Sequence, residues 1–130
     1  MTKADHKSAF LYFEDDILTA VIKPDVDLGI EEMAELLEFT NQFTNYQKRY
    51  TIIDTRSEYN SKPEVQKFYA EHESVKYRYA DAFIVNSLPM RILVNFYIRF
   101  HKPKIPTKLF NNMEAAKLWI EQLKKASITH

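Results

Sequence analysis

Segments with a strand pattern alternate with segments of helical periodicity along this chain, after an opening pair of strands. Residues 9–14 and 17–22 are rich in aromatic and aliphatic side chains, and the acidic pair Asp15 and Asp16 between them predicts a hairpin turn. Further strands are expected at residues 50–54, 80–85 and 107–110. The order β-β-α-β-α-β-α-β-α predicts an α/β fold with a mixed, mostly parallel sheet of about five strands and about four helices.

Four segments have apolar side chains at the spacing of an amphipathic helix. They cover residues 29–45, 61–75, 87–100 and 111–123. Ser61 and Glu64 have the spacing of a capping box at the start of the second helix. Asn111, with Glu114 three residues later, is expected to cap the last helix.

The length and composition of the chain predict one soluble domain. The chain has 130 residues, of which 45% are hydrophobic, so it can build one core but leaves little room for a second. We expect a single domain over residues 1–130, with residues 1–8 as a flexible arm. The chain opens without a signal-peptide pattern, and its longest apolar stretch, residues 92–100, is too short to span a bilayer. Together with the absence of cysteine, this predicts a cytoplasmic protein.

Charge is unevenly distributed, although the formal net charge is zero at pH 7. Residues 1–65 contain seven Lys and Arg against 13 Asp and Glu, whereas residues 66–130 contain eleven against five. Residues 82–113 contain no acidic side chain and five basic ones, which are Arg91, Arg99, Lys102, Lys104 and Lys108. Nucleic-acid binders usually present a broad basic surface, so a neutral chain argues against that class and leaves only a local basic face.

Several positions in the second half of the chain form a pattern around a buried strand, an apolar helix, and a final strand and helix. They are residues 80–85, Ser87, Arg91, Lys102, Pro103, Pro106, Thr107, Lys108, Phe110, Ala116 and Trp119. This pattern resembles a group of bacterial domains of unknown function, notably from Bacteroidetes. Those domains are similar to the STAS fold of anti-sigma-factor antagonists and to related small, lipid-carrier-like domains. The resemblance covers most of the chain, is most specific over residues 81–120, and implies a STAS-like fold.

One departure from that family concerns phosphorylation. STAS antagonists typically have a phosphorylatable serine just after a central strand, in a turn that resembles Asp-Ser-Ser-Gly. Here the turn after residues 50–54 reads Asp54-Thr55-Arg56-Ser57, with hydroxyl groups but with no glycine and no paired serines. The resemblance therefore implies the fold rather than a role, and Thr55 and Ser57 remain the weaker candidates for a phospho-acceptor.

The single glycine, Gly29, excludes several catalytic classes. Phosphate-binding loops and dinucleotide fingerprints need several glycines so that the backbone can approach the ligand, and a G-x-S-x-G elbow is absent as well. The histidines His6, His72, His101 and His130 are scattered and none has a second ligand four residues on, which argues against a metal site. We therefore expect no catalytic residues, no metal and no cofactor, and hence a protein that is not an enzyme.

Polar side chains follow two of the predicted strands, where ligands bind in open parallel sheets. The set is Asp54, Thr55, Arg56, Ser57, Asn86, Ser87 and Arg91. In one interpretation these side chains form a small polar pocket, with an anion site at the start of the helix that begins at Ser87. In the other they form hydrogen bonds only with nearby residues of the chain. In the local interpretation Asp54 and Ser87 cap backbone N–H groups and Arg56 is solvated.

Residues 87–100 form the most unusual segment, because this predicted helix is apolar on almost every side. The candidate interaction surface consists of Ile92, Leu93, Phe96, Tyr97, Phe100 and Lys102. A helix outside a sheet exposes one side, so something is expected to cover it. One possible cover is the chain itself, through residues 101–106 and the N-terminal arm. A second is another protein molecule, either a second copy or a different partner. A third is a lipid or membrane surface, which would also contact the neighbouring basic residues.

These observations predict a non-enzymatic regulatory or protein-interaction module of STAS-like type. Its interaction surface is expected around residues 92–100 and residues 54–57. The alternative is a carrier or sensor of a small apolar or anionic ligand, held between residues 86–91 and the aromatic side chains of the flanking helices. Association with a membrane surface is a further option within that alternative.

Overall fold

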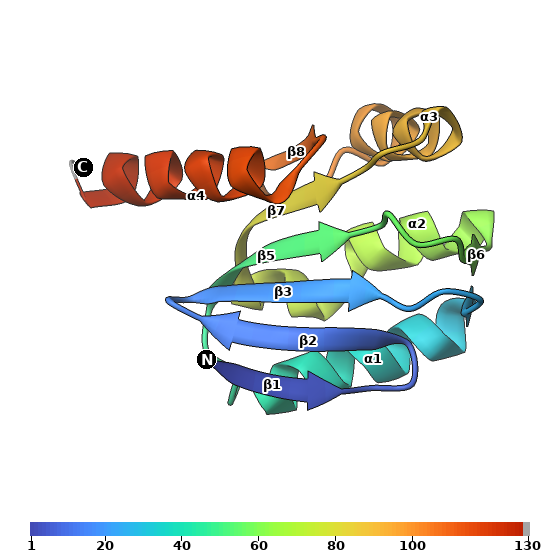
Figure 1. The fold of residues 1–130 in the computed structure, drawn as a ribbon, viewed down its shortest axis with the longest axis horizontal. Helices are drawn as coiled ribbons and strands as arrows, with labels where there is room; N and C mark the ends of the chain where they lie inside the picture. Colours follow the sequence, from blue (N-terminus) through green and yellow to red (C-terminus); the bar gives the residue numbers. More distant parts are fainter. Residues whose placement is uncertain (129–130) are drawn as a thin grey trace.

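The sheet at the centre of the fold has six strands among residues 1–128, the residues that this computed structural model describes (Figure 1). Its strands, in order across the sheet, are β1 (Thr2–Asp5), β2 (Ala9–Glu14), β3 (Ile17–Ile22), β5 (Arg49–Asp54), β7 (Arg78–Ile84) and β8 (Thr107–Phe110). β1, β2 and β3 are antiparallel neighbours, whereas β3, β5, β7 and β8 run parallel. A separate parallel pair is formed by β4 (Asp27–Leu28) and β6 (Asn60–Ser61).

The prediction of a mostly parallel sheet of about five strands is wrong in two respects. The sheet is mixed, as expected, but two of its neighbouring pairs are antiparallel, so it is not mostly parallel, and it contains β1 as a sixth strand. Residues 2–5, which the sequence placed in an N-terminal arm, pair with β2 through Thr2↔Phe13 to Asp5↔Phe10. An edge strand is held by backbone hydrogen bonds and needs no apolar face, so its polar sequence gave no strand signal.

The hairpin predicted at residues 9–22 is confirmed. β2 and β3 pair in register from Ala9↔Ile22 to Glu14↔Ile17. Asp15 and Asp16 both have positive φ angles, 53° and 64°, which a two-residue type I′ turn requires. Aspartate adopts this backbone conformation more readily than most residues, so an Asp-Asp pair replaces the usual Asn-Gly.

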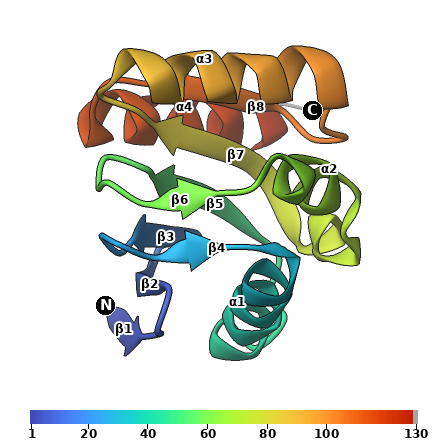
Figure 2. The same cartoon turned by 90° about the vertical axis from the view of Figure 1, so that its right-hand side faces the viewer.

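Helices lie on both faces of the sheet. α1 (Ile30–Phe43) and α2 (Pro63–Glu71) cover one face, and a 3-10 turn, η1 (Glu73–Tyr77), follows α2 after the extended residue His72 (Figure 2). α3 (Leu88–Phe96) continues into a π-helical turn, η2 (Tyr97–His101), and the last helix is α4 (Met113–Ile128). None of the helices in residues 1–128 combines the length and the apolar character that crossing a bilayer needs.

The alternation of side chains along β5 explains why both faces of the sheet are buried. Tyr50 and Ile52 belong to the core under α4, where they pack with Ala116 and Ile120 of that helix. The intervening Thr51 points to the opposite face, which α1 and α2 cover, because successive strand residues face opposite ways. The strand is therefore buried along most of its length, as expected for a central parallel strand.

Two predicted helix caps are wrong. Ser61 lies in β6, and α2 begins at Pro63 after Lys62, whose side chain makes no capping hydrogen bond. At the start of α4 it is Asn112, one residue later than predicted, whose Oδ1 accepts from the backbone N–H of Ala115 at 2.8 Å. Capping depends on the φ and ψ angles of one residue, and spacing along the sequence locates it only to within a position or two.

Two histidines have side chains that act as hydrogen-bond acceptors for the backbone. Nδ1 of His6 accepts from the N–H of Ser8, and Nδ1 of His72 accepts from the N–H of Ser74, both at 3.0 Å. Burial lowers the pKa of each imidazole below the value of 6.5 that it has when unperturbed. Protonation therefore favours the unfolded chain, and the stability that these bonds contribute is present above pH 6.5 and is lost as the pH falls through the lowered pKa.

We expect the free energy of unfolding to decrease by about 1 kcal/mol or less per histidine between about pH 7 and about pH 5. Urea denaturation at a series of pH values measures it. The double variant H6N/H72N is the control, because an asparagine side chain can accept from the same N–H and does not titrate. An identical pH dependence in the wild type and the double variant would contradict the assignment.

Candidate functional site

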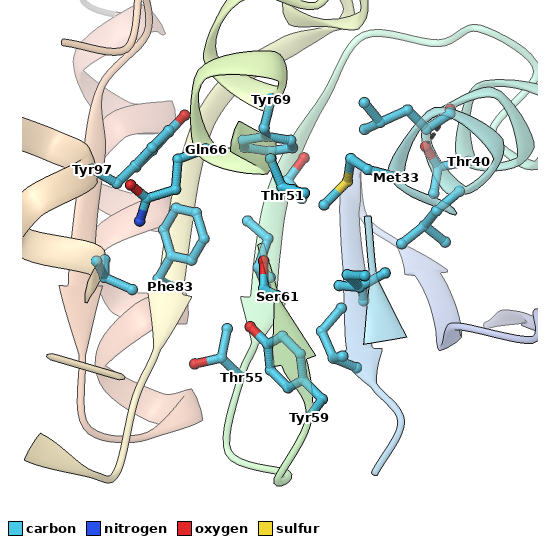
Figure 3. Close-up of a pocket in the computed structure, with 18 of the residues that line it drawn as sticks. Met33, Thr40, Thr51, Thr55, Tyr59, Ser61, Gln66, Tyr69, Phe83 and Tyr97 are labelled. Atoms are coloured by element: carbon cyan, nitrogen blue, oxygen red, sulfur yellow. Dashed lines mark hydrogen bonds between the residues drawn. The ribbon is translucent and has the colours of Figure 1, made fainter. Parts of the chain in front are cut away.

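A cavity of about 120 Å³ lies between the sheet and the helices α1, α2 and α3 (Figure 3). Most of its wall is apolar and includes Leu18 of β3, Leu36 of α1, Val65 of α2 and Leu93 of α3. Ala20 lies between larger apolar residues on β3, and its short side chain leaves space at the centre of the face. The wall of the cavity is thus formed by elements that are far apart in the sequence.

Two arginines line the same cavity at the start of neighbouring strands. Arg49 opens β5 and Arg78 opens β7, and the two residues are paired across the strands. An irregularity in the register between Arg49 and Tyr50 accompanies this pairing. Only 1% of Arg49 and 3% of Arg78 is exposed, so both guanidinium groups are held away from water. Buried arginines are rare unless other groups compensate their charge.

The arginines have incomplete sets of partners. Nη2 of Arg49 donates to Oδ1 of Asn41 at 2.9 Å, and Nη1 donates to the carbonyl of Gln47 at 3.3 Å. Nε of Arg78 lies 3.5 Å from Oδ1 of Asp81, and its guanidinium carbon lies 4.2 Å from the centre of the Tyr69 ring. The Tyr69 hydroxyl donates to Oδ2 of Asp81 at 3.0 Å. We call Arg49, Tyr69, Arg78, Asp81 and Tyr97 the polar cluster.

Several polar atoms in and beside the polar cluster have no hydrogen-bond partner within the described part of the chain. They are Nε of Arg49, Nε and Nη1 of Arg78, Oδ1 of Asp81, Oγ1 of Thr51 and the hydroxyl of Tyr97. A buried polar group without a partner is uncommon in folded proteins and suggests a water or a ligand. Thr51 and Tyr97 both line the cavity, but their unsatisfied oxygen atoms are themselves buried and do not face its open space.

Burial dominates the electrostatics of the polar cluster. Removal from water, together with the charge of Arg78, lowers the pKa of Arg49 to about 10. Burial raises the pKa of Asp81, although Arg78 and the hydrogen bond from Tyr69 oppose that shift. Burial also raises the pKa of the Tyr69 and Tyr97 hydroxyls, which therefore stay protonated as donors. Two guanidinium groups face one carboxyl group, so the cluster has an excess of positive charge.

The polar residues predicted after β5 interact mainly with their own surroundings. Asp54 is buried and accepts two hydrogen bonds from the Arg56 side chain, at 3.0 and 2.8 Å, and one from the Arg56 backbone N–H. The Thr55 hydroxyl donates to the carbonyl of Ile84 at 2.7 Å, and the Ser57 hydroxyl donates to the carbonyl of Ile22. Asp54 thus caps a backbone N–H as expected, whereas Arg56 is paired rather than simply solvated. Both candidate phospho-acceptor hydroxyls are engaged with backbone carbonyls.

The predicted residues after β7 also act locally. Oγ of Ser87 accepts from the backbone N–H of Met90 at 3.3 Å and caps α3, while Arg91 donates to Asn111 near the start of α4. Asn86 is exposed. Of the predicted polar set, Thr55 lines the cavity and the others lie outside its wall. The structure thus does not bring the two groups of polar residues together in one pocket.

The predicted interaction surface divides into an inner and an outer side. Leu93 and Tyr97 line the cavity, whereas Ile92, Phe96 and Phe100 are 60%, 50% and 68% exposed. The rings of Phe96 and Phe100 stack with centres 4.9 Å apart. We call Ile92, Phe96 and Phe100 the α3 stripe, and the exposed Lys102 lies just beyond it.

The α3 stripe remains uncovered by the segments that were expected to fold over it. The N-terminal residues form β1 at the far edge of the sheet, with four strands between β1 and β8. The connection after His101 leads into β8 and leaves the three side chains of the stripe exposed. The interpretation in which the chain covers its own apolar helix is therefore wrong.

Sequence reasoning missed the polar cluster. Arg49 lies one residue before the strand predicted at residues 50–54, and Arg78 lies two residues before the strand predicted at residues 80–85, so both were left outside. Asp81 lies inside one of these apolar runs, and a charged residue in a buried strand was the signal that could have revealed the cluster. The proximity of Arg49, Arg78 and Asp81 depends on strand pairing, which the sequence pattern does not specify.

Comparison with known proteins identifies a family and a fold. Residues 11–124 match the family described as a domain of unknown function, DUF7793. Among solved structures, the chain is similar to an uncharacterized protein of the DUF3478 family from Shewanella loihica PV-4 that is described as having a SpoIIAA-like fold. The TM-score is 0.54 at 16% sequence identity, over 84% of this chain and 89% of the other.

The comparisons identify the fold of this chain but do not identify its function. No curated protein matches the chain. The SpoIIAA-like neighbour confirms the STAS-like fold that the sequence resemblance implied, because SpoIIAA-like and STAS-like describe the same architecture. Since the match extends over most of its length, the chain belongs to the DUF7793 family of domains of unknown function.

Proposed function

We propose that this domain is a non-enzymatic regulatory module of STAS-like type that binds a protein partner through the α3 stripe. The observation behind the proposal is the exposure of Ile92, Phe96 and Phe100 on one side of a helix whose other side is buried. Isolated apolar residues are common on protein surfaces, but a contiguous aromatic and aliphatic row is typical of an interaction site. Aromatic side chains are also the residues that most often contribute binding energy at interfaces.

The charges beside the α3 stripe favour a partner with acidic residues. Arg99 and Lys102 are exposed next to the stripe, and residues 82–113 contain basic but no acidic side chains. In a two-fold dimer the same basic side chains would meet across the interface and repel each other. A partner segment with apolar residues at its centre and carboxylates at its edges complements this surface in both respects.

The partner can be identified by photo-crosslinking in cells that produce the protein. p-Benzoylphenylalanine in place of Phe96 is the probe, and the same residue in place of the exposed Leu118 on α4 is the control. We expect a crosslink specific to position 96, and mass spectrometry gives the partner segment. The proposal is supported if the crosslinked segment has apolar residues at its centre and acidic residues at its edges. The segment should also bind the purified domain with an affinity that decreases as the salt concentration increases.

The substitution F96D is expected to weaken binding of that segment by about tenfold or more, because it places a charge in the apolar centre of the interface. The matched variant L118D should bind like the wild type, since Leu118 is equally apolar and exposed but lies on another helix. Isothermal titration calorimetry measures both affinities. Equal loss in both variants, or none in either, contradicts the assignment to the stripe.

Two further measurements test whether the α3 stripe binds a second copy of the chain or a lipid surface instead of a protein partner. Light scattering after size exclusion detects a dimer, and a dimer that F96D dissociates would assign the stripe to a second copy. Flotation with vesicles of equal parts phosphatidylcholine and phosphatidylglycerol detects membrane binding, and F96D-sensitive flotation would assign it to a lipid surface. Either result, in the absence of a specific protein crosslink, overturns the proposal of a protein partner.

A further inference from the structure

The outer side of β1 is an open edge of the sheet, at the end away from α3 (Figure 1). β1 pairs with β2, and no strand within residues 1–128 pairs with its other side. Its residues are exposed, except Ala4, which is half-buried. Leu36 of α1 is buried in one cluster with Leu11 of β2 and Leu18 of β3, so this helix packs behind those strands and leaves the edge open.

The hydrogen bonds of β1 show which of its backbone groups point outward. The N–H of His6 donates to the carbonyl of Ala9 at 3.0 Å, so His6 directs its backbone groups towards β2. Successive residues of a strand direct these groups to opposite sides, so Ala4 also faces β2, where it pairs with β2. The N–H and C=O groups of Lys3 and Asp5 therefore point away from the sheet, and nothing within residues 1–128 bonds to them.

A second copy of β1 is complementary to this edge. When a two-fold axis normal to the sheet relates two antiparallel β1 strands, the outward groups of one copy meet the outward groups of the other. In the register centred on Ala4, Lys3 of each copy lies opposite Asp5 of the second copy. Each of these opposed pairs exchanges both of its N–H···O=C hydrogen bonds, so every outward group of Lys3 and Asp5 gains a partner.

Charge selects this register over its neighbours. Opposite charges on directly opposed residues stabilise a pair of strands, and like charges destabilise it. A shift of the second copy by two residues in one direction places the two Lys3 side chains opposite each other, and a shift in the other direction does the same for the two Asp5 side chains. A lysine on an edge strand usually prevents pairing, but here Asp5 of the second copy compensates it.

We propose that this domain forms a two-fold dimer by antiparallel pairing of β1 with β1 of a second copy, with Lys3 opposite Asp5. The two sheets then join into one continuous sheet. The contact differs from the dimer expected at residues 92–100, because the α3 stripe lies beyond the opposite edge of the sheet (Figure 1). The dimer therefore presents two α3 stripes, and the proposal goes beyond the binding of a protein partner without depending on it.

Charge reversal tests the pairing of Lys3 with Asp5. Sedimentation equilibrium of the untagged protein over a series of concentrations should show a reversible monomer–dimer equilibrium. K3E and D5K each place like charges opposite each other, so each alone should weaken the association by about tenfold or more. An equimolar mixture of K3E and D5K places opposite charges together again and should associate as a heterodimer. K117E, at an exposed position on α4, is the control and should associate like the wild type.

Disulfide trapping tests the register, because the chain has no cysteine of its own. Residue 3 of one copy and residue 5 of the other are expected to have Cα atoms about 5.5 Å apart, which a disulfide spans. A mixture of K3C and D5C should therefore form a mixed disulfide under mild oxidation. Either variant alone should not, since its two cysteines are two residues out of register.

Proline substitution tests the backbone hydrogen bonds of the edge. K3P removes an N–H that points outward, so β1 keeps its bonds to β2 while the dimer loses hydrogen bonds. K3A removes the same charge and keeps the N–H. K3P should therefore weaken the association several-fold more than K3A.

Three results would overturn the proposal. The first is a wild type that stays monomeric up to millimolar concentrations. The second is a dimer that K3E and D5K leave intact, or one that F96D dissociates and they do not, which would assign the contact to the α3 stripe. The third is a disulfide that K3C alone forms as efficiently as the mixture with D5C. The photo-crosslink at position 96 does not involve β1, so failure of this proposal and failure of the protein-partner proposal are distinguishable.

Discussion

Replacing Asp81 by alanine is expected to destabilise the protein by about 3–5 kcal/mol, because it removes the carboxyl group from a buried charge cluster. Asp81 is fully buried, and Arg78 beside it is nearly so. Without Asp81 the Arg78 guanidinium keeps its cost of burial and loses its ion pair, and the Tyr69 hydroxyl loses its acceptor. Urea denaturation, monitored by circular dichroism, gives the change in the free energy of unfolding.

An exposed ion pair provides the matched control for this prediction. Asp5 pairs with Lys23 at the surface, and D5A should cost about 1 kcal/mol or less, because water replaces the lost partner. The double variant R78M/D81A should recover much of the stability that D81A loses, since it removes both buried charges. Equal effects of D81A and D5A would contradict the interpretation of Asp81 as the compensating charge of the cluster.

Replacing Ile120 by alanine is expected to cost about 2–5 kcal/mol, because this side chain is fully buried between α4 and the sheet. It packs in one cluster with Ile52 of β5 and with Ala82 of β7. These strand residues form a rigid surface, which can collapse only partly into the space that the substitution leaves. The same denaturation experiment measures the loss.

Leu118 lies two residues away on the same helix and faces solvent. L118A should therefore change stability by no more than about 0.5 kcal/mol, although it removes a side chain of the same size. Comparing I120A with L118A separates the effect of burial on the free energy of unfolding from the effect of helix propensity. A similar loss in the two variants would mean that α4 does not pack on the sheet in the orientation described here.

The two faces of the sheet differ in how completely they are packed. Under α4, small residues of β7 such as Ala80 and Ala82 meet Ala116 and Ile120 closely. On the other face, α1, α2 and α3 enclose the cavity that carries the polar cluster. α3 and η2 have two sides, because Leu93 and Tyr97 line the cavity while Ile92, Phe96 and Phe100 are exposed. Large losses of stability are expected on both faces, from Ile120 under α4 and from Asp81 beside the cavity.

Much of the element order was predictable from local pattern. The hairpin of residues 9–22, the strand at 107–110 and the long helix after Gly29 all have a periodicity that neighbouring residues alone produce. β1, β4 and β6 were missed, because they are short or polar and are held by backbone pairing, β1 with the neighbouring β2 and β4 with the distant β6. The STAS-like fold was inferred from a resemblance, and the sixth strand of its mixed sheet became evident only once β1 was placed.

The sequence by itself determined the four main helices and the strands of residues 9–14, 17–22, 50–54, 80–85 and 107–110, and that the helix of residues 87–100 is more apolar than a single buried side requires. It determined this because side-chain periodicity within one segment is a local property. Only the tertiary structure decided that Arg49 and Arg78 are neighbours, that Asp81 faces Arg78, and that a cavity lies beside them. Those relations arise from pairing and packing between elements that are distant in the chain, which no local pattern encodes. The same packing decided that the outer side of the apolar helix stays exposed, because the N-terminal strand pairs at the opposite edge of the sheet.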